Sequence, residues 1–245
     1  MKRIAVLTAL LFAALQIGYA QKVGLVLSGG GAKGAAHIGV IKALEENGIP
    51  IDYITGTSAG AIVGSLYAMG YTPEEMVELM LSEEFSYWQT GTVENEYKYY
   101  FKRPDPTPEF GHFSIDMTDS LQVKASFFPQ SLINPIQMNQ AFMALFSQAT
   151  AKAGWNFDNL FVPFRCVASD IYSKKAIIFK NGDLGDAVRA SMTFPFFFQP
   201  IWKDSVPIFD GGIYDNFPVG PMKEAFHPDF IFGSTVAGGN NKPSS

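Results

Sequence analysis

The chain has 245 residues, of which 47% are hydrophobic and 17% charged, a composition that favours one sizeable globular domain and excludes a disordered chain. The formal net charge is −5 and no long basic run occurs, which argues against a nucleic-acid partner and against strong electrostatic binding to anionic lipid. A single cysteine, Cys166, excludes an internal disulfide framework.

The first 20 residues have the pattern of an export signal. Lys2 and Arg3 precede an apolar run over residues 4–17, and residues 18–20 (GYA) form a small-x-small cleavage site. The run is short for a transmembrane helix, and a buried N-terminal helix is the alternative interpretation. We expect a secretory signal peptide in residues 1–20 and an exported protein in the periplasm, at the outer membrane or outside the cell.

The mature sequence begins with two βα units. Residues 23–27 (VGLVL) are typical of a strand buried in a parallel sheet, and a helical stripe follows that ends near Asn47. Residues 53–55 predict the end of a second strand, and residues 59–69 predict a buried helix. This succession predicts parallel strands joined by a right-handed crossover.

A third helix is expected to begin at residues 72–75 (TPEE). Thr72 suits the N-cap, Pro73 suits the first helical position, and the two acids suit the first turn.

Residues 85–135 interrupt the regular alternation. Aromatic segments over residues 97–101 and 110–115 flank a proline-rich stretch over residues 103–108, which predicts a hairpin with a proline-rich tip. We interpret residues 85–135 as an aromatic-rich insertion beside the sheet, either a lid or a plain structural excursion.

The rest of the chain returns to alternating elements. We expect helices over residues 134–147 and 185–191, and strands over residues 161–169, 175–179, 206–210 and 229–235. Cys166 falls in the first of these strands and is expected to be a small core residue rather than a nucleophile. Residues 238–245 (GGNNKPSS) resemble a linker, so we expect a domain over residues 21–237 and a chain that is the front of a longer protein.

Residues 56–60 (GTSAG) match G-x-S-x-G, a sharp strand-to-helix turn that exposes a serine hydroxyl. Gly56 and Gly60 avoid a clash of Cβ atoms with nearby backbone, and Ser58 itself is expected in a strained conformation. The free N–H groups of the helix that begins at Ser58 face any negative charge that develops nearby. An ordinary Gly/Ser turn is the alternative.

Residues 29–34 (GGGAKG) admit a dinucleotide-binding interpretation, because Gly29, Gly31 and Gly34 match G-x-G-x-x-G between a strand and a helix. The acidic residue expected at the end of the second strand is missing, and Asp52 stands at its beginning. A P-loop would need a lysine where Ala35 stands.

The other interpretation of this glycine loop is an oxyanion hole. Adjacent glycines leave their N–H groups unshielded, and a helix beginning near Ala32 would add its dipole. Beside Ser58, such a loop would bind the oxygen of a tetrahedral intermediate.

A nucleophilic serine needs a base. His37, His112 and His227 are scattered, lack metal-ligand spacing, and are each disfavoured as the catalyst; His37 points toward neither turn in any obvious way. Asp210 is the better candidate, because it ends a strand and is followed by two glycines. A carboxylate with the ordinary aspartate pKa of about 3.9 is a weak base, but burial raises the pKa of aspartate. A plain Asp-Gly turn is the alternative.

Together, residues 29–34 (GGGAKG), 56–60 (GTSAG) and 210–212 (DGG) resemble the signature of the patatin-like phospholipases, in the same order. Residues 167–170 (VASD) and 189–195 (RASMTFP) also resemble blocks of that family. The resemblance covers residues 22–235. It implies an α/β fold with three α/β/α layers and a mainly parallel central sheet.

The resemblance also implies an activity: hydrolysis of fatty acyl esters of (phospho)lipids by a Ser–Asp dyad, without a metal or another cofactor. Ser58 would be the nucleophile and Asp210 the base. The implied oxyanion hole consists of Gly29, Gly30, Gly31 and Ala59, and the remaining motif glycines are Gly34, Gly56, Gly60, Gly211 and Gly212. The implied partner is a lipid substrate at a membrane or micelle surface. By analogy with some exported bacterial relatives, a longer chain would continue into a C-terminal outer-membrane barrel.

Two rival functions remain open at this point. One is a non-catalytic lipid-binding or export module on the same fold. The other is a nucleotide-binding oxidoreductase, which the missing acidic residue and the signal peptide disfavour.

The most aromatic stretch is residues 194–200 (FPFFFQP). It would line an acyl-chain pocket, touch a bilayer, or pack in the core, and core packing is the favoured interpretation.

Overall fold

The computed structural model describes residues 21–92, 112–116, 122–126 and 132–238, and for residues 112–116 and 122–126 it describes only the backbone. The expected signal peptide and nearly all of the linker-like end lie outside the described residues. Within these ranges, no helix is both long enough and apolar enough to cross a membrane.

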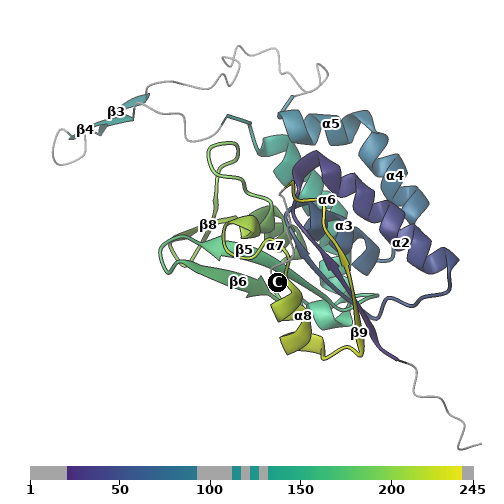
Figure 1. Cartoon of the computed structure of the whole chain (residues 1–245). Helices are drawn as coiled ribbons and strands as arrows, with labels where there is room; N and C mark the ends of the chain where they lie inside the picture. Colours follow the sequence, from purple (N-terminus) through teal and green to yellow (C-terminus); the bar gives the residue numbers. More distant parts are fainter. Residues whose placement is uncertain (1–20, 93–111, 117–121, 127–131, 239–245) are drawn as a thin grey trace, which may run out of the picture.

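A seven-stranded mixed sheet forms the centre of the fold (Figure 1). The strand order is β7-β8-β5-β2-β1-β9, and β6 also pairs with β5. Strands β5, β2, β1 and β9 run parallel, whereas β6, β7 and β8 are added antiparallel. The mainly parallel centre and the parallel pairing of the first two strands are therefore confirmed. The strands are β1 (Val23–Leu27), β2 (Tyr53–Thr57), β5 (Phe164–Asp170), β6 (Lys175–Phe179), β7 (Ile201–Lys203), β8 (Val206–Asp210) and β9 (Phe230–Ser234).

Helices connect the strands and cover the sheet (Figure 1). They are the α-helices α2 (Ala36–Glu46), α3 (Ala59–Ala68), α4 (Pro73–Leu81), α5 (Glu83–Thr90), α6 (Ile136–Lys152), α7 (Leu184–Ser191) and α8 (Val219–Phe226), and the 3₁₀ helices η1 (Gly31–Ala35), η3 (Phe157–Asn159) and η4 (Gly211–Ile213).

Alternate residues of β2 show that the fold has three layers. Ile54 packs against α3 at Gly64, on one face of the sheet. On the other face, the Thr55 hydroxyl donates a hydrogen bond to the Pro218 carbonyl (3.0 Å), and the ring of Tyr53 stacks on Phe226 of α8 at 4.6 Å. Because successive strand residues point to opposite faces, the sheet lies between α3 and α8, and the expected α/β/α layering is confirmed.

The start of α4 confirms the predicted cap. The Thr72 hydroxyl accepts a hydrogen bond from the Glu75 N–H (3.2 Å), and the Glu75 carboxylate accepts one from the Thr72 N–H (2.8 Å). This reciprocal capping box satisfies two backbone donors that the first turn would otherwise leave unpaired.

The structure differs from the predicted elements in several places. The glycine loop leads first into the 3₁₀ helix η1 rather than directly into an α-helix at Ala32. Helix α5 and strand β7 were not predicted; α5 buries none of its side chains and therefore has no strong apolar stripe. Strand β3 (His112–Asp116) pairs antiparallel with β4 (Gln122–Ser126), a pairing that was not predicted. The predicted hairpin arm over residues 97–101 lies outside the described residues.

Candidate active site

Ser58 occupies the turn between β2 and α3, with backbone angles φ 54° and ψ −121°. Such a conformation is unfavourable for a residue with a Cβ atom. The turn is closed by tight packing, because a Cβ atom on Gly56 would collide with the Gly60 carbonyl and one on Gly60 would collide with the Leu27 carbonyl. The expected sharp, strained turn is therefore present, and it lifts the serine side chain out of the sheet.

A buried serine holds the backbone of this turn. The Ser58 N–H donates a hydrogen bond to the Ser191 hydroxyl (2.9 Å), which itself donates to the Val167 carbonyl (2.6 Å). Ser191 is fully buried at the end of α7. Sequence reasoning did not assign it a role, and the only signal was its place in the block over residues 189–195.

Strand pairing brings Asp210 to the same end of the sheet as Ser58. Thr57, the residue before the serine, pairs with Val167 of β5, and the next β5 residue, Ala168, pairs with Asp210 of β8. Two residues separated by about 150 positions in the chain thus lie one strand apart. The dyad partners that the sequence predicted are brought together.

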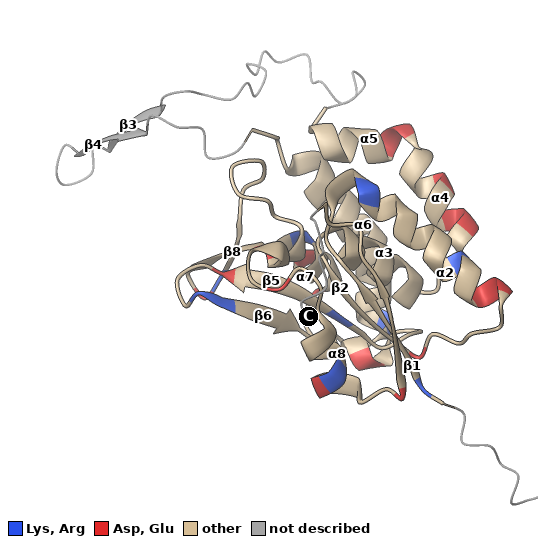
Figure 2. Ribbon diagram, in the orientation of Figure 1, with Lys and Arg blue, Asp and Glu red and all other residues tan. Residues whose placement is uncertain are grey.

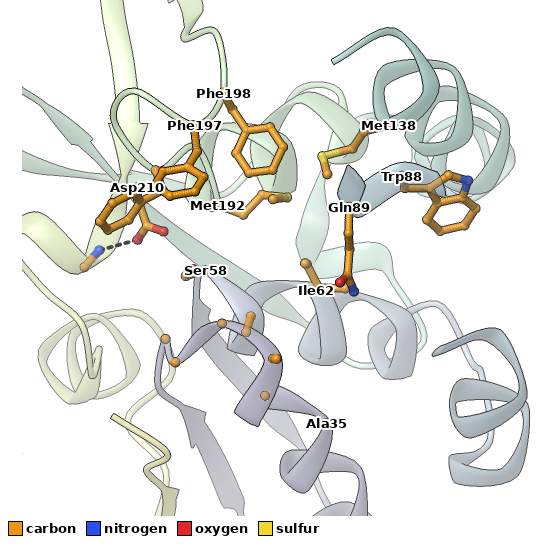
Figure 3. A pocket seen from close by; sticks show the side chains of 18 of the residues that line it. Ala35, Ser58, Ile62, Trp88, Gln89, Met138, Met192, Phe197, Phe198 and Asp210 are labelled. Atoms are coloured by element: carbon orange, nitrogen blue, oxygen red, sulfur yellow. Dashed lines mark hydrogen bonds between the residues drawn. The ribbon is translucent and has the colours of Figure 1, made fainter. Parts of the chain in front are cut away.

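The Asp210 side chain is buried and held in place by backbone groups. Its carboxylate accepts a hydrogen bond from the Gly212 N–H (2.7 Å), and its own N–H donates to the Thr193 carbonyl (2.8 Å) (Figure 3). Burial raises the pKa of the Asp210 carboxyl, while the hydrogen bonds from the Gly212 N–H and the Ser58 hydroxyl oppose that rise. An aspartate with a raised pKa is a stronger base than an exposed one.

The glycine loop is fixed from one side by Asn216. The Gly29 N–H donates to the Asn216 carbonyl (3.1 Å), and the Asn216 side-chain amide donates back to the Gly29 carbonyl (3.3 Å). Among the described residues, the N–H groups of Gly30, Gly31 and Ala59 have no hydrogen-bond partner. The loop and the start of α3 therefore present unpaired donors next to Ser58.

His37 supports the same loop, which corrects the expectation that it points toward neither turn. Its side chain is fully buried, with Nε2 2.9 Å from the Ser28 carbonyl and Nδ1 2.7 Å from the Ser234 hydroxyl. A carbonyl only accepts, so Nε2 carries the proton and Nδ1 accepts from the serine. Burial lowers the pKa of His37, which favours this neutral form.

Of the other two histidines, only His227 has a described side chain, and it does not line the cavity. His227 forms the left-handed C-cap of α8, and the side chain of His112 is not described. Cys166 is fully buried in β5, as predicted, and burial raises the pKa of its thiol. No cluster of three or more His, Cys, Asp or Glu side chains suited to a metal occurs in the described part of the chain.

Ser58 and Asp210 open into a cavity of about 940 Å³, at the upper end of the volume range of ligand sites (Figure 3). The glycine loop and Asn216 complete a polar wall. A mostly apolar wall completes the lining and is built by α3, α4, α5, α6 and the segment after α7; its only polar side chain is Gln89, and the others are Ile62, Met80, Phe85, Trp88, Met138, Phe142, Met192, Phe194, Phe197 and Phe198.

The aromatic stretch after α7 contributes to this cavity. Phe194, Phe197 and Phe198 line it, and only Phe198 of the three is buried. The side chain of Phe196 is 74% exposed. The favoured prediction of core packing was therefore wrong for most of this stretch, because its backbone turns outward after Met192 instead of continuing α7.

Known proteins are similar to this chain over most of its length. The family model described as patatin-like phospholipase matches residues 25–223. The lysophospholipase NTE1 of Pyricularia oryzae is 32% identical over 218 residues, which are 88% of this chain and 12% of that protein. A patatin-like phospholipase domain-containing protein of Caenorhabditis elegans is 29% identical over 203 residues, 82% of this chain and 12% of that protein.

This chain thus spans about an eighth of the length of the curated relatives it matches. Among solved structures, VipD from Legionella pneumophila superposes with a TM-score of 0.54 at 16% identity, over 87% of this chain and 49% of that one. That similarity supports the fold.

Proposed function

The chain belongs to the patatin-like phospholipase family, and from this premise we propose that it is a serine acyl hydrolase that cleaves fatty acyl esters of lipids. One observation carries the proposal: a strained serine and a buried aspartate share the polar wall of a large cavity whose other wall is apolar. A lipid ester has the same division, with a polar reacting group and a long apolar chain.

In the proposed reaction, Ser58 Oγ attacks the ester carbonyl carbon while its proton passes to the Asp210 carboxylate. The tetrahedral intermediate collapses, and Asp210 returns the proton to the departing alcohol. Water then attacks the acyl-enzyme with Asp210 again accepting a proton, and the fatty acid is released as Ser58 regains its hydrogen. Because proton transfer accompanies attack, no free alkoxide forms, which suits a base weaker than histidine.

The oxyanion of the intermediate is proposed to bind the unpaired N–H groups of Gly30, Gly31 and Ala59. Losing one donor of such a hole typically costs about 10²–10³ in rate. Gly29 is given a conformational role instead, since its N–H already donates to Asn216. A side chain at Gly29 would displace the Asn216 side chain and crowd Ser58.

The acyl chain is proposed to lie along the apolar wall, beside Ile62, Met138 and Phe142. The fungal relatives carry the name lysophospholipase, and a single-chain phospholipid is therefore the first substrate to test.

The test is hydrolysis of lysophosphatidylcholine by the purified chain, followed as released fatty acid. We expect turnover by the wild type and none by Ser58→Ala, with both proteins giving the same circular dichroism spectrum. A wild type that binds the lipid but releases no fatty acid would instead establish the non-catalytic lipid-binding module.

A further inference from the structure

An apolar face borders the cavity on one side. We call it the aromatic face and define it by the exposed side chains of Leu132, Ile136, Phe194, Phe196 and Phe197. Phe194 and Phe197 belong both to this face and to the cavity lining, so the surface and the cavity are continuous. Contiguous exposed apolar surface of this kind marks an interaction site.

The two segments of the face are joined by backbone hydrogen bonds. The Leu132 N–H donates to the Phe196 carbonyl (2.9 Å), and the Ile133 N–H donates to the Phe197 carbonyl (3.0 Å). The rings of Phe194 and Phe197 meet edge to face at 5.6 Å. The face is thus an assembled surface, with its two backbone segments held in fixed relative positions.

Arg189 anchors the phenylalanine segment from beneath. This buried guanidinium donates to the Thr193 hydroxyl (2.6 Å), the Gln199 carbonyl (3.1 Å) and the Asn139 side-chain oxygen (3.0 Å). Its hydrogen bonds therefore join both ends of the segment over residues 193–199 to the first turns of α6. The outward position of the phenylalanines is therefore set by buried contacts.

Phe196 has the most exposed ring of the face and also an unfavourable backbone. Its φ of 69° is rare for a bulky residue, and the ring gains no burial in return. Both unfavourable features are offset when the ring enters an apolar medium, since transfer of a phenylalanine side chain out of water is strongly favourable.

The aromatic face carries no charge. Neither residues 132–151 nor residues 190–202 contain Asp, Glu, Lys or Arg. The charged residues lie elsewhere, many of them on α2, α4 and α8, whereas α6 has a single lysine at its far end (Figure 2). A charge-free aromatic surface fits a lipid surface of zero net charge better than an anionic membrane, which basic residues attract.

We propose that the aromatic face docks on the surface of uncharged, zwitterionic lipid, with Phe196 inserted among the lipid chains. Docking places the cavity mouth against the lipid, so that an acyl chain passes to Ser58 without crossing water. This inference deepens the proposed function by naming the surface from which the substrate is taken.

The test measures flotation of the full chain with phosphatidylcholine vesicles, in a Ser58→Ala background so that no lipid is hydrolysed. We expect Phe196→Ser to lower the partition coefficient about tenfold, as loss of most of one buried aromatic side chain predicts. Phe161→Ser is the matched control, because Phe161 is 76% exposed against 74% for Phe196. Phe161 precedes β5 and therefore lies at the opposite end of the parallel strands from Ser58. We expect the partition coefficient of the Phe161→Ser variant to stay within twofold of that of the parent protein.

A second readout separates docking from catalysis. With Ser58 intact, we expect Phe196→Ser to retain hydrolysis of a water-soluble short-chain ester while losing about tenfold in activity on lysophosphatidylcholine carried in phosphatidylcholine vesicles. Flotation does not depend on turnover. A wild-type protein that floats with the vesicles but hydrolyses neither ester would support the docking proposal and overturn the proposed function.

Three results would overturn the docking proposal. The first is an equal loss of flotation in Phe196→Ser and Phe161→Ser. The second is flotation only with vesicles that contain anionic lipid. The third is a dimer, seen by sedimentation velocity, that Phe196→Ser dissociates while flotation is unchanged, which would assign the aromatic face to a second copy of the chain.

Discussion

The two walls of the cavity are built by different physical means. On the polar wall, hydrogen bonds fix individual atoms, as when Ser191 holds the Ser58 N–H and Gly212 holds the Asp210 carboxylate. On the apolar wall, side chains from four helices and one connecting segment fill the space by packing, while hydrogen bonds hold the backbone of the connecting segment. We therefore expect the polar wall to tolerate little change in geometry, and the apolar wall to tolerate more and to govern which acyl chain fits.

The largest expected effect falls on the polar wall. Asp210→Asn keeps the shape and the hydrogen bond from Gly212 but removes the base, so we expect kcat to fall by at least about 10³-fold, as for other residues of a catalytic unit. Asp186→Asn is the control, because the pKa of Asp186 is also raised but the residue is exposed and does not line the cavity. Residual activity above about 10% of wild type in Asp210→Asn would contradict the dyad.

A positioning residue should give the next largest effect. Ser191→Ala leaves the Ser58 N–H without a buried acceptor, and we expect kcat to fall about 10- to 100-fold with KM unchanged, because the nucleophile shifts while the binding wall stays intact. Ser65→Ala removes an equally buried serine from the middle of α3 and should leave kcat unchanged.

Steady-state kinetics on a soluble ester, together with the fraction of folded protein, distinguish a loss of positioning from a loss of stability in Ser191→Ala. A loss of Ser191→Ala activity that follows the fraction of unfolded protein would mean that Ser191 acts only on stability. Ser191→Thr, which restores a hydroxyl, should recover part of kcat.

On the apolar wall, a change in shape should alter selectivity rather than chemistry. Ile62→Trp narrows the cavity beside Ser58, and we expect kcat/KM for a long-chain ester to fall about tenfold while that for an acetyl ester is retained, as is usual for steric exclusion in apolar sites. An equal loss of kcat/KM for both esters would show that a change in the apolar wall also disturbs the catalytic groups of the polar wall.

The smallest expected effect is in the pH dependence. Asp210 must be ionised to accept a proton, and burial raises its pKa, so activity should be lost as the pH falls through a value above the usual aspartate pKa of about 3.9. His227→Gln should not move this acid limb of the kcat/KM profile. An acid limb near the usual histidine pKa of about 6.5 that disappears in a histidine variant would assign the base to histidine instead.

The same contrast explains what the sequence could predict. The polar wall has sequence motifs, because the Ser58 turn and the residues after Asp210 need glycine for steric reasons. Glycines at a fixed spacing can be recognised in the sequence alone. The helical part of the apolar wall has none, since Ile62, Met138 and Phe142 are ordinary hydrophobic residues whose meeting depends on helix packing. For the same reason, core packing was the favoured interpretation of residues 194–200: hydrophobicity alone does not distinguish a buried ring from one that lines a cavity.

Supporting residues were the least predictable part of the site. His37 binds the carbonyl of Ser28 only because α2 and the end of β9 meet there, and Ser191 reaches Ser58 only because α7 crosses the end of β2. The strand order was predictable only for the first two strands. The antiparallel addition of β8, which delivers Asp210, depends on pairing between distant segments.

Reaction with a fluorophosphonate probe tests the central claim most directly, because the probe labels only a serine that is activated and backed by an oxyanion hole. We predict stoichiometric labelling of the purified wild-type chain at Ser58 and none of Ser58→Ala. A folded wild type that resists the probe, or that is labelled equally in Ser58→Ala, would contradict the assignment of this cavity as the active site of a serine acyl hydrolase.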